Sequence, residues 1–142
     1  MSKINSARRP VMNEYCSKFW KMALPSDWVA EADPDCETLF HPEGNGVLQF
    51  STLVQAEDIS QDDLRAFAIE HIEAGAKPET QQVGGFSGLY LSYDDAEYYW
   101  REWYLRAGKL FLFVTYHCQL EDEGNEDDIV DQILDSLETT IQ

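Results

Sequence analysis

The side chains best suited to nucleophilic or metal chemistry are three histidines and three cysteines, which are scattered along the chain. They are Cys16, Cys36, His41, His71, His117 and Cys118. Only His117 and Cys118 are adjacent in the sequence, which suggests a thiol–imidazole pair. Neighbouring residues on a strand point to opposite faces, so these two side chains cannot hydrogen-bond each other. His41 and His71 are isolated, and we interpret them as surface or packed histidines.

Motifs for metals and cofactors are missing from the sequence. Neither an HExxH motif nor a paired Cys/His spacing for zinc occurs. The acidic residues 121–128 do not match the calcium-binding EF-hand loop, because Gln119 and Val130 occupy positions where that loop has acids. Fingerprints of phosphate-binding loops, dinucleotide sites and GxSxG hydrolases do not occur either. The sequence therefore predicts no catalytic residue, no metal and no cofactor, and a protein that is not an enzyme.

Charge restricts the classes of partner. The 142 residues include 10 Lys and Arg against 27 Asp and Glu, which gives a net charge of −17. A surface this negative repels nucleic acids and anionic lipids, so we expect neither as a partner. It attracts a basic protein, although solubility alone also explains the charge. The predicted partner is a protein, with the domain itself a monomer or a homodimer.

Cysteine usage and hydropathy indicate the compartment. The three cysteines are an odd number without CxxC spacing, which favours reduced thiols over a disulfide framework. The basic N-terminal residues are not followed by an apolar run, so a secretory signal is not expected. Apolar runs are far shorter than the ~20 residues that span a bilayer. We therefore expect a cytoplasmic protein that does not engage a membrane.

The structural element that must position any site is residues 98–118, which hold eight of the eighteen aromatic residues. They predict two strands joined at residues 106–109. With Ala107 and Gly108 as a two-residue turn, Leu105 would lie opposite Leu110. Both faces of this hairpin are rich in apolar residues, which leaves two alternatives. Either helices cover both faces, or one aromatic face is a binding surface. The candidate binding residues are Tyr98, Trp100, Tyr104 and His117.

The remaining pattern predicts further strands and two helices in an α+β fold. Strands are expected over residues 19–24, 38–40, 47–54, 79–83 and 86–93. One helix is expected from Ser60, with Asp63 as a capping box, to Gly75. A second should begin at Asn125 and continue its apolar stripe to Ile141. Short turns predict a mainly antiparallel sheet. Residues 1–16 are expected to be a flexible arm and residues 17–142 a single domain.

A family resemblance adds to this prediction. The segment Phe19-x-x-Met22-x-Leu24-Pro25-x-x-Trp28 resembles the opening of the PsbP-like superfamily, and the order of elements agrees over residues 19–140. The superfamily includes PsbP of photosystem II, the Ran-binding factor Mog and adaptor chaperones of type VI secretion effectors. The resemblance implies an α/β/α sandwich and a function in protein binding. It implies no individual site residue.

From these patterns we expect a non-catalytic cytoplasmic protein-binding domain that acts as an adaptor or a chaperone. A variant is an immunity protein whose acidic face masks a basic toxin. The alternative is a small-ligand-binding domain with an aromatic pocket between sheet and helix.

Overall fold

The computed structural model describes residues 11–141. Its strands are β1 (Met12–Cys16), β2 (Trp20–Pro25), β3 (Val29–Ala32), β4 (Glu37–Phe40), β5 (Gly46–Val54), β6 (Glu79–Val83), β7 (Phe86–Asp94), β8 (Tyr98–Ala107), β9 (Leu110–Gln119) and β10 (Glu138–Thr139). Its helices are α1 (Gln61–Phe67), α2 (Ile69–Glu73), the 3-10 helix η2 (Leu120–Asp122) and α3 (Asp127–Asp135). Within residues 11–141, none of the helices is long and apolar enough to cross a membrane.

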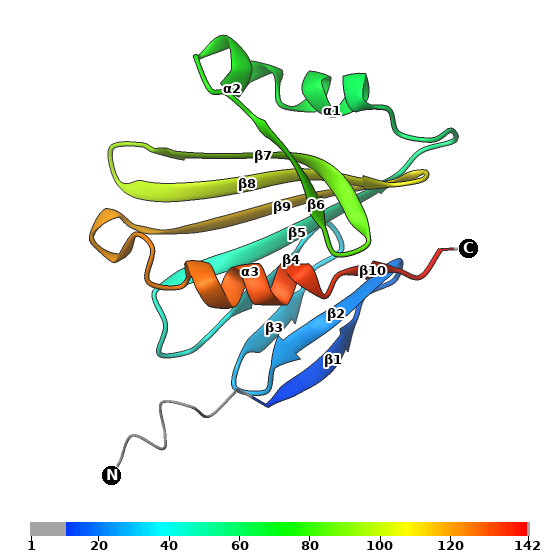
Figure 1. Cartoon of the computed structure of the whole chain (residues 1–142). Coiled ribbons are helices and arrows are strands. Elements are labelled where there is room, and N and C mark those ends of the chain that lie inside the picture. Colours follow the sequence, from blue (N-terminus) through cyan, green and yellow to red (C-terminus); the bar gives the residue numbers. More distant parts are fainter. Residues whose placement is uncertain (1–10, 142) are drawn as a thin grey trace.

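Two antiparallel sheets form the fold (Figure 1). The larger has seven strands in the order β3-β4-β5-β9-β8-β7-β6, and every neighbouring pair is antiparallel. The smaller has the order β1-β2-β10. This arrangement confirms the predicted α+β class with a mainly antiparallel central sheet.

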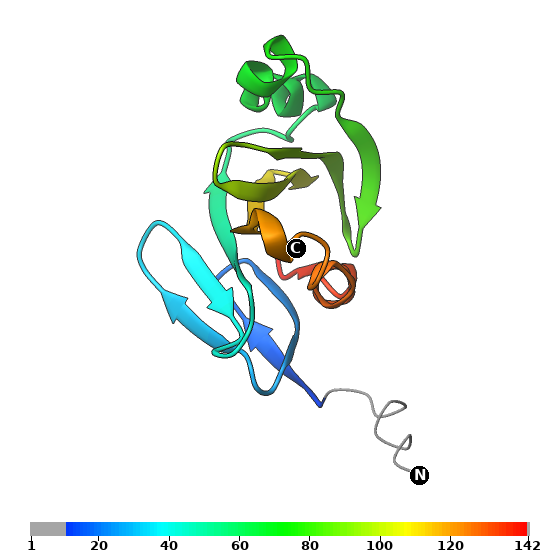
Figure 2. The same cartoon turned by 90° about the vertical axis from the view of Figure 1, so that its left-hand side faces the viewer.

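The two faces of the large sheet are covered differently. On one face α1 and α2 pack over β7 and β8, around a core that includes Leu64, Leu89 and Tyr104. The sheet curves, and its concave face holds α3 and the small sheet (Figure 2). Trp20 of β2 and Trp103 of β8 are in this larger core. The layer on the concave face combines α3 with the three-stranded sheet instead of consisting of helices alone. The α/β/α sandwich that the resemblance implies therefore stays a prediction.

The β8–β9 hairpin has the predicted faces but a different register. Ala107 pairs with Leu110, and Leu105 with Leu112 rather than with Leu110. Gly108 has φ +61, and the described residues contain no non-glycine residue with positive φ. A type II′ turn needs positive φ at its first central residue only, so the turn is Gly108–Lys109. The shift is by two residues, and because strand faces alternate with period two, each side chain keeps its predicted face.

Both predicted helices are shorter in the structure. The capping box of Ser60 and Asp63 is present, but the first helix is divided at Ala68 into α1 and α2. The last helix is capped at Glu126 rather than Asn125 and ends at Asp135. Beyond it, residues 138–139 form β10 against β2, so tertiary pairing overrides the apolar period that continues to Ile141.

The predicted arm of residues 1–16 is only partly described. Residues 1–10 lie outside the described part of the chain. Residues Met12–Cys16 form β1, which pairs with β2, so the prediction of a flexible arm is wrong there. The side chain of Tyr15 donates a hydrogen bond of 2.5 Å to Glu37, which ties this strand to β4.

Candidate functional site

Four rings from three strands gather on the sheet face that carries α1 and α2. They are Tyr93 of β7, Tyr98 and Trp100 of β8, and His117 of β9, here called the aromatic surface. Trp100 pairs across the strands with both Tyr93 and His117, so the register itself brings the rings together. The rings of Trp100 and His117 stack with centroids 4.5 Å apart, and Tyr98 packs edge-on against His117 at 5.3 Å. All four side chains are half-buried.

The turn that precedes β8 fixes the indole of Trp100. Asp95 Oδ1 accepts hydrogen bonds from the backbone N–H groups of Glu97 (2.8 Å) and Tyr98 (2.7 Å). Its other oxygen accepts from Trp100 Nε1 at 2.8 Å. These hydrogen bonds lower the pKa of the Asp95 carboxyl, the backbone donor of Glu97 most. A fixed negative charge therefore lies at the edge of the aromatic surface.

His117 contributes a neutral ring to the surface. Burial lowers the pKa of its imidazole below the ordinary value, and the Asp95 charge opposes that effect only in part. Its Nδ1 is buried and has no hydrogen-bond partner among residues 11–141. A neutral imidazole stacked on an indole forms a flat, weakly polar contact surface. The side chain of Cys118 lies in the core on the opposite face of the sheet. This is the arrangement predicted for two adjacent residues of one strand.

Tyr104 does not belong to the aromatic surface, although the sequence suggested it. It lies on the same face but is only 4% exposed, beneath α1 and α2. Its hydroxyl donates a 2.7 Å hydrogen bond to Glu102 Oε1. Burial, followed by this hydrogen bond, raises the pKa of Tyr104. Tyr104 is covered because it lies toward the end of β8 beneath these helices, whereas Tyr98 and Trp100 lie at the open end.

Sequence reasoning missed a polar cluster around Glu102. This buried carboxylate also accepts a 2.8 Å hydrogen bond from Tyr93 and lies 3.2 Å from His71 Nε2. His71, predicted as a surface or packed histidine, is half-buried and packs against Tyr93. His41 also has a carboxylate partner, with its Nε2 3.2 Å from Asp27 Oδ2 at the surface. An acid between Trp100 and Tyr104 on one face of β8 was the available signal for Glu102. Its partners outside that strand come from β7 and α2 and depend on packing.

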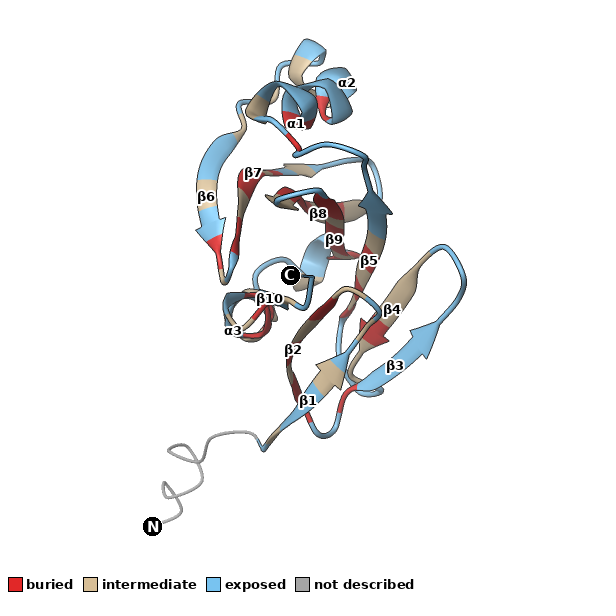
Figure 3. Ribbon diagram, turned by 90° about the vertical axis from the view of Figure 1, so that its right-hand side faces the viewer, coloured by how far each residue is buried: buried red, intermediate tan, exposed pale blue. Residues whose placement is uncertain are grey.

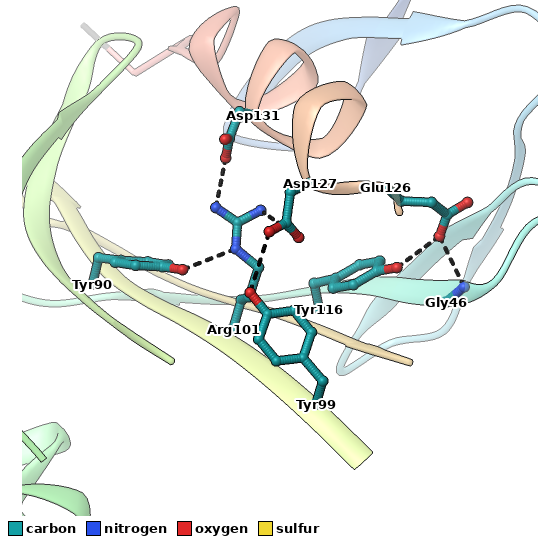
Figure 4. A network of polar contacts seen from close by, with 8 residues as sticks. All are labelled: Gly46, Tyr90, Tyr99, Arg101, Tyr116, Glu126, Asp127 and Asp131. Atoms are coloured by element: carbon teal, nitrogen blue, oxygen red, sulfur yellow. Dashed lines mark hydrogen bonds and ion pairs between the residues drawn. The ribbon is translucent and has the colours of Figure 1, made fainter. Parts of the chain in front are cut away.

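On the opposite face, a polar network attaches α3 to the sheet (Figure 4). Arg101 is 6% exposed and donates to Tyr90 (2.9 Å) and to Asp131 (2.7 Å). Its guanidinium also lies 4.7 Å from the ring centroid of Trp103. Every partner belongs to the fold, so we interpret this network as structural. Glu126 extends it by accepting hydrogen bonds from Tyr116 (2.7 Å) and from the backbone N–H of Gly46 (2.9 Å).

Two hollows are relevant to ligand binding. A pocket of about 220 Å³ opens between β6 and α3 beside Arg101 and Trp103, with several polar side chains around it. A larger, open one of about 440 Å³ lies between the turn after β1 and the turn after β3. Within residues 11–141, no group of three or more His, Cys, Asp or Glu side chains is placed to hold a metal ion.

Comparison with known proteins identifies a fold but not a family. No protein-family model matches the sequence, and no curated protein matches it. A solved structure from Bacteroides thetaiotaomicron VPI-5482 is similar with a TM-score of 0.67 and 14% identity, over 87% of this chain and 46% of the other. This chain therefore spans about half of that protein. LpqN, involved in cell envelope biogenesis of Mycobacterium tuberculosis, has a TM-score of 0.60 and 13% identity over 99% of this chain and 97% of LpqN.

A third similar structure is that of cyanobacterial PsbP (CyanoP) from Synechocystis sp. PCC 6803. It has a TM-score of 0.49 and 11% identity, over 94% of this chain and 95% of CyanoP. At identities this low, such likenesses concern the fold alone.

Proposed function

We propose that this chain is a non-catalytic protein-binding domain, adaptor-like or chaperone-like, that contacts its partner through the aromatic surface. One observation carries the proposal: stacked rings of Trp100 and His117 remain partly exposed on a sheet face whose other end is covered by α1 and α2. Aromatic side chains with a polar tip provide large contact area at low conformational cost, and they are enriched where proteins bind each other.

The partner that this surface fits best is basic. Exposed Asp94, Asp95 and Glu97 border the rings, and the whole chain carries a net charge of −17. Negative side chains around an apolar contact surface speed the encounter with a positively charged protein and favour it over other partners. The same charge supports the immunity-like variant, in which the acidic face masks a basic toxin. A cytoplasmic location and the PsbP-like or Mog-like resemblance remain part of this proposal.

The alternative function, small-ligand binding between sheet and helix, has weaker support. The pocket between β6 and α3 measures about 220 Å³. Pockets for drug-sized ligands hold roughly 300 to 1,000 Å³ and are mainly apolar. Arg101 and Asp131 in its wall are already bonded to each other.

Affinity capture with matched variants tests the proposal. The wild-type chain and the Trp100→Ala and Ile69→Ala variants would each be used to capture proteins from the native cell at low salt. Ile69 is a suitable control, because it is 44% exposed and lies on α2. We expect a basic protein that the wild type and Ile69→Ala retain and that Trp100→Ala loses. Equal capture by all three chains would exclude the aromatic surface as the contact.

A further inference from the structure

Strand β3 forms an open edge of the large sheet. Among residues 11–141 it pairs with β4 alone, and all four of its residues are exposed. Figures 2 and 3 both show it at the outer margin of the molecule. A strand in this position presents backbone donors and acceptors that another chain can pair with. Proline and charged side chains, above all lysine, protect edge strands against pairing with other chains. Val29–Ala32 contains no proline and no lysine and carries one charge, on Glu31.

The hydrogen-bond pattern identifies the groups that point outward. Asp33 and Cys36 exchange both backbone bonds, with N···O distances of 2.8 and 3.3 Å. In an antiparallel ladder, hydrogen-bonded and non-hydrogen-bonded pairs alternate. Along β3 the pairs Ala32–Glu37 and Ala30–Leu39 are therefore the non-hydrogen-bonded ones. The N–H and C=O groups of Ala30 and Ala32 face away from β4, toward the open edge.

The chain segment that forms this edge is acidic. Residues 27–43 contain no Lys or Arg, and they contain the acids Asp27, Glu31, Asp33, Asp35, Glu37 and Glu43. A second copy of the chain would bring another charge of −17 to this edge. A strand with lysine or arginine side chains would instead be attracted, and one placed opposite Glu31 would form a favourable cross-strand pair.

The edge is also continuous with the aromatic surface. His117 pairs with Val47 of β5, and Val29 of β3 pairs with Phe40 of β4. Because side chains alternate along each strand, Val29, Phe40 and Val47 lie on the same face as Trp100 and His117. Partly exposed apolar side chains thus extend across the sheet from the rings to the open edge.

We propose that β3 accepts a basic β-strand of a protein partner, which pairs with the backbone groups of Ala30 and Ala32. The inference rests on the proposed function, since it specifies how the protein partner is held. Backbone hydrogen bonds would provide the attachment, and lysine or arginine side chains would provide selectivity through Glu31 and the neighbouring acids.

A basic strand-forming peptide tests the proposal directly. The probe is acetyl-Lys-Val-Lys-Val-Lys-Val-amide, with a second version N-methylated at every residue so that neither backbone edge can donate. Wild type would be compared with Ala30→Pro, which removes an outward N–H without removing a bond to β4, and with Ala30→Ser, which keeps that N–H. Binding would be followed by fluorescence anisotropy at low salt, and folding by circular dichroism.

We expect wild type and Ala30→Ser to bind the unmodified peptide equally and Ala30→Pro to bind it at least about tenfold more weakly. The N-methylated peptide should bind weakly to all three. Equal binding of both peptides, equal binding by Ala30→Pro, or no binding at about 1 mM peptide would overturn the inference.

Two further measurements separate this inference from the proposed function and from misfolding. In the wild-type chain, hydrogen exchange at the Ala30 and Ala32 amides should slow when the peptide binds, and unchanged exchange would contradict strand addition. If the native partner depends on Trp100 but not on the Ala30 N–H, the aromatic surface stands and strand addition at β3 is excluded.

Discussion

The indole ring of Trp100 stacks on the imidazole of His117, with centroids 4.5 Å apart and planes inclined by 25°. The two residues are cross-strand partners in β8 and β9, so the stack is built by the register of the central hairpin. Three residues further along β8, Trp103 faces the opposite core and is 2% exposed. The same strand thus supplies one tryptophan to the core and one to a surface.

Substitution should separate these two roles. Trp103→Ala is expected to lower the free energy of unfolding by about 3–5 kcal/mol, because it leaves a cavity in the core. Trp100→Ala should cost about 1 kcal/mol, since the ring is only partly buried and loses mainly stacking and the hydrogen bond to Asp95. Urea unfolding followed by circular dichroism measures both. Similar losses in the two variants would contradict this difference in role.

The pKa of His117 predicts a pH dependence of stability. Burial lowers this pKa in the folded state, so as pH falls the unfolded chain binds a proton at this residue first. The contribution to stability is therefore complete above about pH 6.5 and is lost below it, toward the folded-state pKa. We expect wild type to lose more stability than His117→Phe between pH values of about 7.5 and 5.5.

Urea unfolding at several pH values gives this difference, and titrations of other groups largely cancel in it. The folded-state pKa of His117 can be measured separately from imidazole chemical shifts. A midpoint above about 6.5 would show that the Asp95 charge outweighs burial.

The three cysteines should differ widely in reactivity. Cys16 is exposed, Cys36 is half-buried, and Cys118 is 2% exposed, with a pKa raised by burial. A thiol reagent reacts with the thiolate, so Cys118 can be labelled only when the sheet opens locally. We expect Cys118 to be labelled on the order of a hundredfold more slowly than Cys16. Mass spectrometry of timed samples tests this, and comparable rates would mean that β9 opens readily.

Arg101 should be a major contributor to the attachment of α3. Arg101→Ala is expected to cost about 2–3 kcal/mol, because it removes the bonds to Tyr90 and Asp131 and the packing on Trp103. Asp131→Asn should cost less than about 1 kcal/mol, since that side chain is 53% exposed. A double-mutant cycle of the two gives their coupling. Additive effects would assign the role of Arg101 to packing rather than to the ion pair.

The predictable parts of this fold are those set by local pattern. Alternation along residues 98–118 was enough to assign each side chain of the hairpin to a face. Register depended on which residue takes positive φ, and the sequence allowed Gly108 at either position of the turn. The end of α3 was not predictable from its apolar period, because pairing of Glu138 with Lys21 of β2 decides it.

The candidate site was predicted in part for a similar reason. Tyr98, Trp100 and His117 come together because they are neighbours on paired strands. Tyr104 was assigned to the same face correctly, but only the position of α1 and α2 shows that it is covered. The contact between Glu102 and His71 joins β8 to α2 and has no signature in either segment.

The position of β2 between β1 and β10 has a consequence for synthesis of the chain (Figure 1). One neighbour of β2 is β1, which is synthesised just before it. The other is β10 (Glu138–Thr139), which is synthesised after all the other described strands. At about 5–20 residues per second, the ribosome leaves that edge of β2 unpaired for on the order of ten seconds. During this interval Trp20 and Met22 also lack the cover of α3, so the nascent chain exposes the apolar face of β2 to solvent.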